Sequence, residues 1–192
     1  MLDRREAVVA LLQPRGDALV VAGLGSPTWD VAAAGDSPHN FYLWGAMGGA
    51  AMIGLGLALA QPARRVVVIT GDGEMLMGLG SLATIGAERP RNLAIVVLDN
   101  ERYGETGMQP SHTARGVDLA GVARAASFAS ATTIDTPEAL QGWVTTLYGS
   151  AGPVFAAVKV LPDQPPLRAP LRDGTHIKNR FREALLGPTA FL

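Results

Sequence analysis

Cysteine is absent from the 192 residues of this sequence. That absence excludes a disulfide scaffold, a thiolate zinc site, an iron–sulfur cluster and a cysteine nucleophile. It also fits a reducing compartment, and we predict a cytoplasmic protein. Charge is scarce too, because 17% of the residues are charged and sixteen basic against seventeen acidic residues leave a formal net charge of −1. Without a clustered excess of lysine and arginine to neutralise phosphates, a general nucleic-acid-binding surface is not expected.

One long uncharged run, residues 41–60, would suffice to cross a bilayer. The glycines within it make it a poor isolated membrane span, and no second run of this kind follows. The opening residues, MLDRRE, are charged and lack the apolar stretch of a signal peptide. We therefore predict a buried helix in this region and no membrane association.

Hydrophobic residues make up 48% of the chain, which is enough for a buried core. Strand-like runs alternate with helix-like runs, a pattern typical of a parallel sheet with helices on both faces. We predict an α/β protein: one three-layer α/β/α domain over residues 1–192, with a mainly parallel sheet of about six strands. Within it, residues 162–192 form a proline-containing connection, a C-terminal helix and a loose tail. The predicted strands are 18–22, 41–44, 65–70, 93–98, 129–134 and 153–160, and the predicted helices are 3–12, 28–34, 46–60, 75–87, 117–127, 137–148 and 178–186.

Two polar motifs directly follow the two most apolar predicted strands. The segment GDGE at 71–74 follows the strand RVVVIT, and Asp99-Asn100 follows the strand LAIVVL. Glycines let a backbone approach a phosphate, and an aspartate beside them makes sense when a divalent cation lies in between. If the strands are neighbours, about 4.8 Å apart, Asp72 and Asn100 can reach one Mg²⁺ ion, which prefers oxygen ligands. Turn-forming side chains after each strand are the alternative.

Together the two motifs resemble the diphosphate-binding motif of thiamine-diphosphate-dependent enzymes, many of which carry a second asparagine where this chain has Asp99. The continuation DNERYGETGMQP at 99–110 is similar to a loop of sulfopyruvate decarboxylase β subunits and phosphonopyruvate decarboxylases. The resemblance covers roughly residues 15–160 and implies thiamine diphosphate and Mg²⁺ as cofactors. As metal ligands it implies the side chains of Asp72 and Asn100 and the backbone carbonyl of Arg102.

The turn GAMG at 45–48 is similar to the aminopyrimidine-binding turn of the same family. The resemblance implies that the Gly45 carbonyl and the Met47 N–H bind the pyrimidine, and that the Met47 side chain wedges the cofactor into a bent shape. An ordinary core residue is the alternative for Met47. In full, the residues implied for cofactor binding are Ser26, Gly45, Ala46, Met47, Gly71, Asp72, Gly73, Glu74, Asn100, Arg102, Tyr103, Gly104 and Thr106.

Complete members of the family also carry a pyrimidine-binding domain whose glutamate activates the cofactor. A single predicted domain has no room for it, so the resemblance implies a partner of the pyrimidine-binding α type in an α2β2 or larger assembly. We predict the diphosphate- and Mg²⁺-binding subunit of a two-chain decarboxylase for a small 2-oxo acid such as sulfopyruvate or phosphonopyruvate. A carboligase subunit similar to acetolactate synthase and a non-catalytic scaffold of the same fold stay open as alternatives.

Three further residues are candidates on the substrate side. His112 could carry a proton as a catalytic residue, and Gln109 lies in the same loop. Arg180, in the basic C-terminal region, could hold an anionic substrate through two parallel hydrogen bonds. A solvated surface is the alternative for His112 and Arg180. A dinucleotide site fits poorly, because Leu76 stands where its third glycine would be needed.

Overall fold

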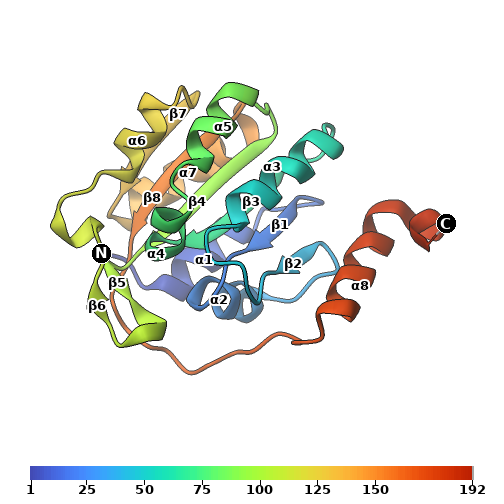
Figure 1. Cartoon of the computed structure of the whole chain (residues 1–192), viewed down its shortest axis with the longest axis horizontal. Helices are drawn as coiled ribbons and strands as arrows, with labels where there is room; N and C mark the ends of the chain where they lie inside the picture. Colours follow the sequence, from blue (N-terminus) through green and yellow to red (C-terminus); the bar gives the residue numbers. More distant parts are fainter. Residues whose placement is uncertain (192) are drawn as a thin grey trace.

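The computed structural model describes residues 1–191 and builds a sheet of six strands in the order β2-β1-β3-β4-β8-β7 (Figure 1). Every pairing between neighbours in this sheet is parallel. The two middle strands are buried on both faces, which explains their unbroken apolar sequences. The predicted α/β fold is confirmed. The strands are β1 (Leu19–Ala22), β2 (Asn40–Tyr42), β3 (Val66–Gly71), β4 (Leu93–Asp99), β7 (Ser130–Ile134) and β8 (Val154–Lys159).

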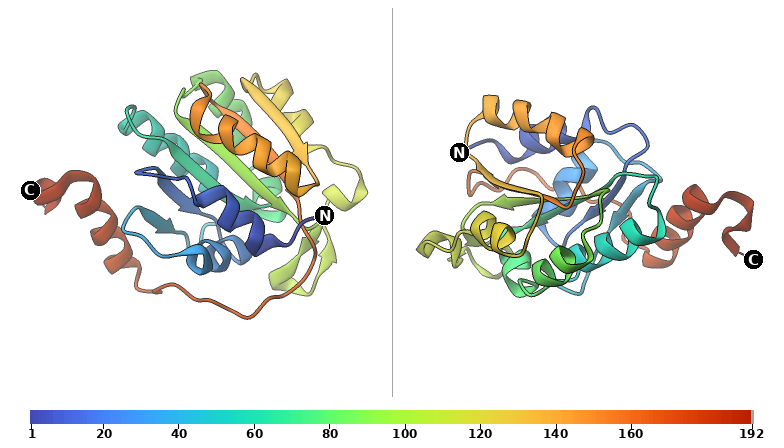
Figure 2. Two further views of the ribbon diagram at one scale, coloured as in Figure 1. Left: turned by 180° about the vertical axis from the view of Figure 1, so that it is seen from behind. Right: turned by 90° about the horizontal axis from the view of Figure 1, so that it is seen from above.

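Helices cover both faces of the sheet, as Figure 2 shows from above. Alternate side chains along each strand supply the two cores. In β3, Val67 and Ile69 belong to one core, whereas Val66 and Val68 belong to the other. No helix among residues 1–191 is long and apolar enough to cross a membrane. The first core is covered by α1 (Arg4–Leu12), α2 (Ser26–Ala34) and α7 (Pro137–Gly149), and the second by α3 (Ala50–Ala60), α4 (Asp72–Met77), α5 (Ser81–Glu88) and α6 (Leu119–Ala125).

The carboxyl ends of β1 and β3 mark where a ligand can enter. These strands are neighbours, but the chain leaves β1 toward α2 on one face and leaves β3 toward α4 on the other. In open α/β sheets, ligands bind in the crevice at such a switch point, outside the carboxyl ends of the strands. The segment at 71–74 therefore lies at the favoured binding position of the fold.

A single helix over 75–87 was predicted, and this prediction is wrong, because the chain forms two helices, α4 and α5. The interruption at 78–80 allows a close backbone contact. A Cβ atom on Gly78 would lie 2.3 Å from the carbonyl oxygen of Gly48. Gly48 itself has a φ of +90°, and Ala46 has a φ of +56°, so the turn before α3 is left-handed and α3 begins at Ala50 rather than at 46.

Gly78→Ala is expected to lower the free energy of unfolding by about 2 kcal/mol or more, which is within the usual range for overpacking. The added methyl group would push the turn at 45–48 away from α4. Gly80→Ala is the matched control, since nothing lies within 4 Å of its Cβ position. Urea unfolding of both variants measures the difference. Equal, small effects would contradict the close contact between Gly48 and Gly78.

The region 99–116, predicted as a polar loop, is more regular than expected. A short antiparallel hairpin pairs β5 (Arg102–Tyr103) with β6 (Gln109–Pro110). One 3₁₀ turn, Gly104–Thr106, lies inside the hairpin, and another, Thr113–Arg115, follows it. The hairpin brings the end of this region back to the carboxyl edge of the sheet.

An extended segment, residues 161–173, runs from the end of β8 along the outside of α1 and α2 (Figures 1 and 2). Near its end, Trp44 Nε1 donates a hydrogen bond to the Leu171 carbonyl at 3.2 Å. The Arg172 guanidinium lies over the rings of Trp29 and Trp44, 5.6 and 5.3 Å from their centroids. These contacts hold the end of segment 161–173 near the carboxyl ends of the strands.

The C-terminal helix α8 (Gly174–Leu186) packs against the β2 edge of the sheet. Phe181 makes an edge-to-face contact with Phe41, with 5.5 Å between ring centroids. The helix begins before the predicted position 178. Residues Gly187–Phe191 form a 3₁₀ helix where a loose tail was expected, and position 192 lies outside the described residues.

Candidate functional site

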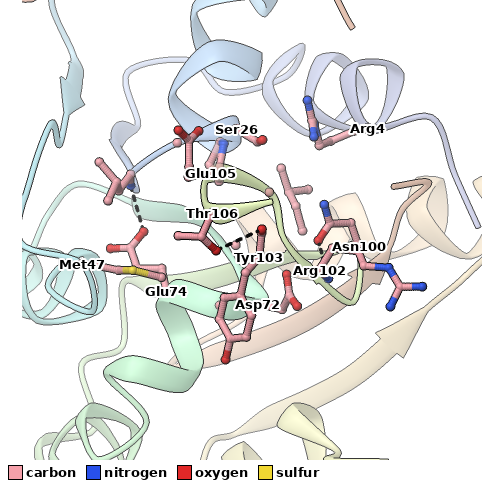
Figure 3. A pocket seen from close by; sticks show the side chains of 17 residues that line it. Arg4, Ser26, Met47, Asp72, Glu74, Asn100, Arg102, Tyr103, Glu105 and Thr106 are labelled. Carbon is pink, nitrogen blue, oxygen red and sulfur yellow. Dashed lines mark hydrogen bonds between the residues drawn. The ribbon is translucent and has the colours of Figure 1, made fainter. Parts of the chain in front are cut away.

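A cavity of about 110 Å³ lies where the carboxyl ends of β1, β3 and β4 meet (Figure 3). Five segments that are distant in the sequence form its wall, so the fold brings together most of the predicted site. The lining residues are Arg4, Leu24–Pro27, Met47, Gly71–Glu74, Leu98, Asn100 and Arg102–Thr106.

Asp72 lies at the start of α4 and is 2% exposed. Its Oδ2 accepts a hydrogen bond from the Ser111 hydroxyl at 2.5 Å, and the Thr113 hydroxyl oxygen lies 3.4 Å from the same atom. Burial, together with the nearby Asp99 carboxylate, raises the pKa of Asp72 to about 6, although the Ser111 hydrogen bond opposes this shift. A buried carboxylate in this state favours a positive charge beside it.

Asn100 shares the cavity wall with Asp72 and serves a turn as well. Its Oδ1 accepts a hydrogen bond from the Arg102 backbone N–H at 3.0 Å. The turn interpretation is thus correct for Asn100, and it leaves the side chain at the cavity. Among residues 1–191, no cluster of three or more histidine, cysteine, aspartate or glutamate side chains could hold a metal by itself. The carboxylate of Asp72 and the amide of Asn100 at the cavity fit Mg²⁺, which proteins commonly bind through one or two side chains together with phosphate oxygens and water.

Glu74 lines the cavity, and its carboxylate is already hydrogen-bonded to three donors of the same chain. Its carboxylate accepts hydrogen bonds from Leu24 N–H at 2.9 Å, Ala50 N–H at 3.2 Å and the Thr70 hydroxyl at 2.7 Å. Burial raises the pKa of Glu74, and these three donors oppose the rise. The side chain thereby joins the turn after β1, the start of α3 and the end of β3, so it shapes the cavity.

Met47 reaches the cavity from the turn at 45–48 (Figure 3). Gly73 faces it, because a Cβ atom there would lie 3.6 Å from the Met47 methyl carbon and 2.7 Å from the Tyr103 ring. Only glycine allows that approach. Gly45 and Ala46 are exposed in the same turn, outside the residues that line the cavity.

Two of the predicted substrate residues, Gln109 and His112, lie beside the cavity rather than in its wall. His112 Nδ1 is 3.0 Å from the hydroxyl of Tyr103, so His112 is connected to the cavity through that ring. Gln109 is bound to Thr106, with its Nε2 donating to the Thr106 carbonyl at 2.8 Å. Both contacts stabilise the loop that carries Tyr103 and Thr106.

Arg180 is not brought to the cavity. It lies on α8 at the β2 edge, where its Nη1 is 2.6 Å from the Asp36 carboxylate. Although partial burial of Asp36 works in the other direction, hydrogen bonds from Arg180 and Tyr42 lower the pKa of Asp36. The structure therefore does not bring this candidate substrate residue to the cavity, because its guanidinium is engaged by Asp36.

Sequence reasoning missed several residues of the wall. Arg4 on α1 borders the cavity and forms an ion pair with the buried Asp30, with 2.5 Å between Nε and Oδ2. Glu105 lines it from the hairpin. A second cavity of about 420 Å³ lies beneath the segment 161–173 and shares Arg4 and Glu105 with the first. Leu24, Gly25 and Pro27 lie beside the predicted Ser26 and could have been found, since they follow an apolar strand as the other motifs do. No feature of the sequence pointed to Arg4.

Residues 24–158 match the family described as thiamine pyrophosphate enzyme, C-terminal TPP-binding domain, and the chain belongs to this family. It is 41% identical over 189 residues to the sulfopyruvate decarboxylase subunit beta of Methanothermobacter thermautotrophicus, covering 98% of both chains. It is also 37% identical over 175 residues to the phosphonopyruvate decarboxylase of Streptomyces viridochromogenes, covering 91% of this chain and 44% of that one.

A solved structure shows the same fold. It belongs to a chain from Mycobacterium smegmatis that is provisionally described as a thiamin diphosphate-dependent enzyme. The two superpose with a TM-score of 0.72 at 24% identity, over 84% of this chain and 32% of that chain. The present chain thus spans about a third of the length of that protein, and the likeness concerns the fold.

Proposed function

We propose that this chain is the diphosphate-binding subunit of a two-chain, thiamine-diphosphate- and Mg²⁺-dependent 2-oxo acid decarboxylase. The observation that carries the proposal is the wall shared by Asp72 and Asn100 at the switch point of the sheet, within a domain of the thiamine pyrophosphate enzyme family. The names of the similar proteins, sulfopyruvate decarboxylase subunit beta and phosphonopyruvate decarboxylase, support decarboxylation as the reaction.

In this proposal the chain's task is to bind and orient the cofactor. The Asp72 carboxylate, the Asn100 amide oxygen and the Arg102 carbonyl would hold Mg²⁺, and Ser26 at the start of α2 would receive the diphosphate. Met47 would support the cofactor from below. Thiamine diphosphate supplies the electron sink for cleavage of the bond between the carboxylate and carbonyl carbons of the substrate.

A partner chain of the pyrimidine-binding type would supply the activating glutamate. The two glutamates that line the cavity support this assignment, because Glu74 is held by three hydrogen-bond donors of its own chain and Glu105 is exposed. The match over 98% of a protein named as a subunit supports it as well. The proposed assembly is α2β2 or larger.

A small dianionic 2-oxo acid is the proposed substrate. We expect the assembled enzyme to prefer sulfopyruvate or phosphonopyruvate to pyruvate and benzoylformate by roughly ten- to a hundredfold in kcat/KM, the factor that one charge-assisted hydrogen bond contributes. Steady-state kinetics on the four acids, with the purified two-chain complex, measures the preference. Faster turnover of benzoylformate would contradict it. Arg180→Ala serves as a control and should affect all four acids equally, because Arg180 is bound to Asp36.

A further inference from the structure

A continuous chain of polar contacts leads from Asp72 away from the cavity to the end of β8. It passes through two hydroxyls, those of Ser111 and Thr113, to Asp99 and then to Lys159. We propose that these four residues are positioning residues, which hold the Asp72 carboxylate in the orientation that metal binding requires. The inference rests on the proposed function, because it takes Asp72 as a metal ligand.

The contact nearest to Asp72 comes from the hydroxyl pair. Ser111 Oγ and Thr113 Oγ1 are 2.9 Å apart, and both lie against the same carboxylate oxygen, Oδ2, at 2.5 and 3.4 Å. Ser111 and Thr113 are 1% and 6% exposed, so water does not compete for these contacts. The Ser111 hydroxyl donates to Asp72 Oδ2, and the Thr113 hydroxyl packs against both Ser111 and this oxygen, so the rotation of the Asp72 carboxylate is fixed.

Asp99 anchors the hydroxyl pair from the other side. Its Oδ1 accepts from the Thr113 hydroxyl at 2.7 Å and from the Glu101 backbone N–H at 3.1 Å. Its Oδ2 lies 2.8 Å from the Lys159 ammonium. Both oxygens of this buried carboxylate are therefore engaged within the chain, which makes Asp99 an anchor rather than a further metal ligand.

The number of available protons decides which group donates in each hydrogen bond between the hydroxyls and the carboxylates. Each hydroxyl has one proton to donate, and an ionised carboxylate can only accept. The shortest contacts assign the Ser111 proton to Asp72 and the Thr113 proton to Asp99. Each carboxylate then has its own hydroxyl donor, and the two aspartates are kept apart although only two side chains separate them.

The ion pair explains why an aspartate is tolerated at position 99. Asp99 and Lys159 are directly opposite each other in the parallel register of β4 and β8. Glu101 also contacts the ammonium, at 2.8 Å, and contacts with Asp99 and Glu101 raise the pKa of Lys159 against the effect of burial. The extra negative charge beside the predicted metal ligand is therefore balanced from the neighbouring strand.

Thr113→Val tests the link between the two carboxylates, because it replaces the hydroxyl by a methyl group of similar size. Without its hydrogen bond to Asp99, residue 113 no longer fixes Ser111 Oγ against Asp72. The Mn²⁺ concentration for half-maximal thiamine diphosphate binding should then rise roughly ten- to a hundredfold, the factor that one hydrogen bond to a charged group contributes. Fluorescence titration of the full chain with Mn²⁺ and thiamine diphosphate, in complex with its partner where binding requires it, gives this value. Ser111→Ala is a second variant with the same expected loss, in case Thr113→Val does not fold.

Two controls separate positioning from general destabilisation. Thr113→Ser keeps the hydroxyl and should stay within about threefold of the wild type, a rescue that a packing role would not produce. Thr133→Val makes the same change at an exposed position of the edge strand β7 and should have no effect. Unchanged Mn²⁺ dependence in folded Thr113→Val and Ser111→Ala would overturn the inference.

The ion pair is tested by a double substitution. Lys159→Met leaves the buried Asp99 without its counter-charge and should lower the melting temperature by about 5 °C or more. Asp99→Asn combined with Lys159→Met should restore it, because asparagine still accepts from Thr113. Failure of the double variant to recover would overturn the anchoring role of Asp99. A wild-type chain that binds no metal and cofactor would instead remove the proposed function, and the inference with it.

Discussion

Asp72→Asn is expected to weaken Mg²⁺-dependent binding of thiamine diphosphate at least a hundredfold and to leave the protein folded. The substitution keeps the size and shape of the side chain but removes the charge that would hold the cation at the carboxyl end of β3. Calorimetric titration with thiamine diphosphate, at saturating and at zero Mg²⁺, measures the loss. Asp17→Asn, at an exposed turn before β1, is the matched control and should bind normally.

The same variant should be more stable than the wild type without metal. Burial raises the pKa of Asp72 from 3.8 to about 6, so the folded protein holds a proton that the unfolded chain releases between these values. Stability from this group is therefore present below about pH 4 and is lost as the pH rises through 6. At pH 7 the loss is on the order of 3 kcal/mol, which Asp72→Asn would recover.

Thermal unfolding at pH 4, 5, 6 and 7 without metal shows whether the advantage of Asp72→Asn grows with pH. Saturating Mg²⁺ and thiamine diphosphate should then raise the melting temperature of the wild type and leave that of the variant unchanged. A variant that binds the cofactor as tightly as the wild type, while folded, would contradict the assignment of Asp72 as a metal ligand.

The strands and the two motifs after them were predictable because local sequence determines them. A central parallel strand is apolar on both faces, so β3 and β4 read as unbroken apolar runs that end where the polar residues begin. Parallel strands also place their carboxyl ends at one edge, which is why Asp72 and Asn100 could be expected near each other. The comparison with known proteins then confirmed the family.

Contacts between distant segments were not predictable from the pattern. The break between α4 and α5 depends on the approach of Gly78 to Gly48, and glycine spacing alone does not reveal the partner. Ser111 reaches Asp72 only because the hairpin of β5 and β6 returns the chain to the edge of the sheet. Short polar residues in a loop carry no signal that says which carboxylate they will meet.

The position of a long side chain was the hardest feature to predict from the sequence. Arg180 was chosen because an arginine can bind an anion, and the chemistry is correct, but the anion it binds is the Asp36 carboxylate. A flexible side chain at the end of a proline-containing connection can reach many positions, so the fold of the connection decides. Here the segment 161–173 leads from β8 across to α8, which packs against β2 at the opposite edge of the sheet from β7.

The isolated chain is expected to decarboxylate no 2-oxo acid and to leave the exchange of the thiamine diphosphate C2 proton near the rate of the free cofactor. Two glutamates line the cavity, and neither suits the activating role. Glu74 is held by three hydrogen-bond donors from its own chain. Glu105 is exposed in the 3₁₀ turn of the hairpin, where solvent screens its charge.

Adding the pyrimidine-binding partner should restore both reactions, because a general acid or base contributes only when it is held within hydrogen-bond reach of the proton it transfers. Proton exchange followed by NMR and carbon dioxide release can be measured on the chain alone, the partner alone and the mixture. The mixture carrying Asp72→Asn is the control and should stay inactive, since metal-dependent cofactor binding is lost. Turnover by the purified chain alone would contradict a partner glutamate, and it would direct attention to Glu105, whose replacement by glutamine should then abolish the activity.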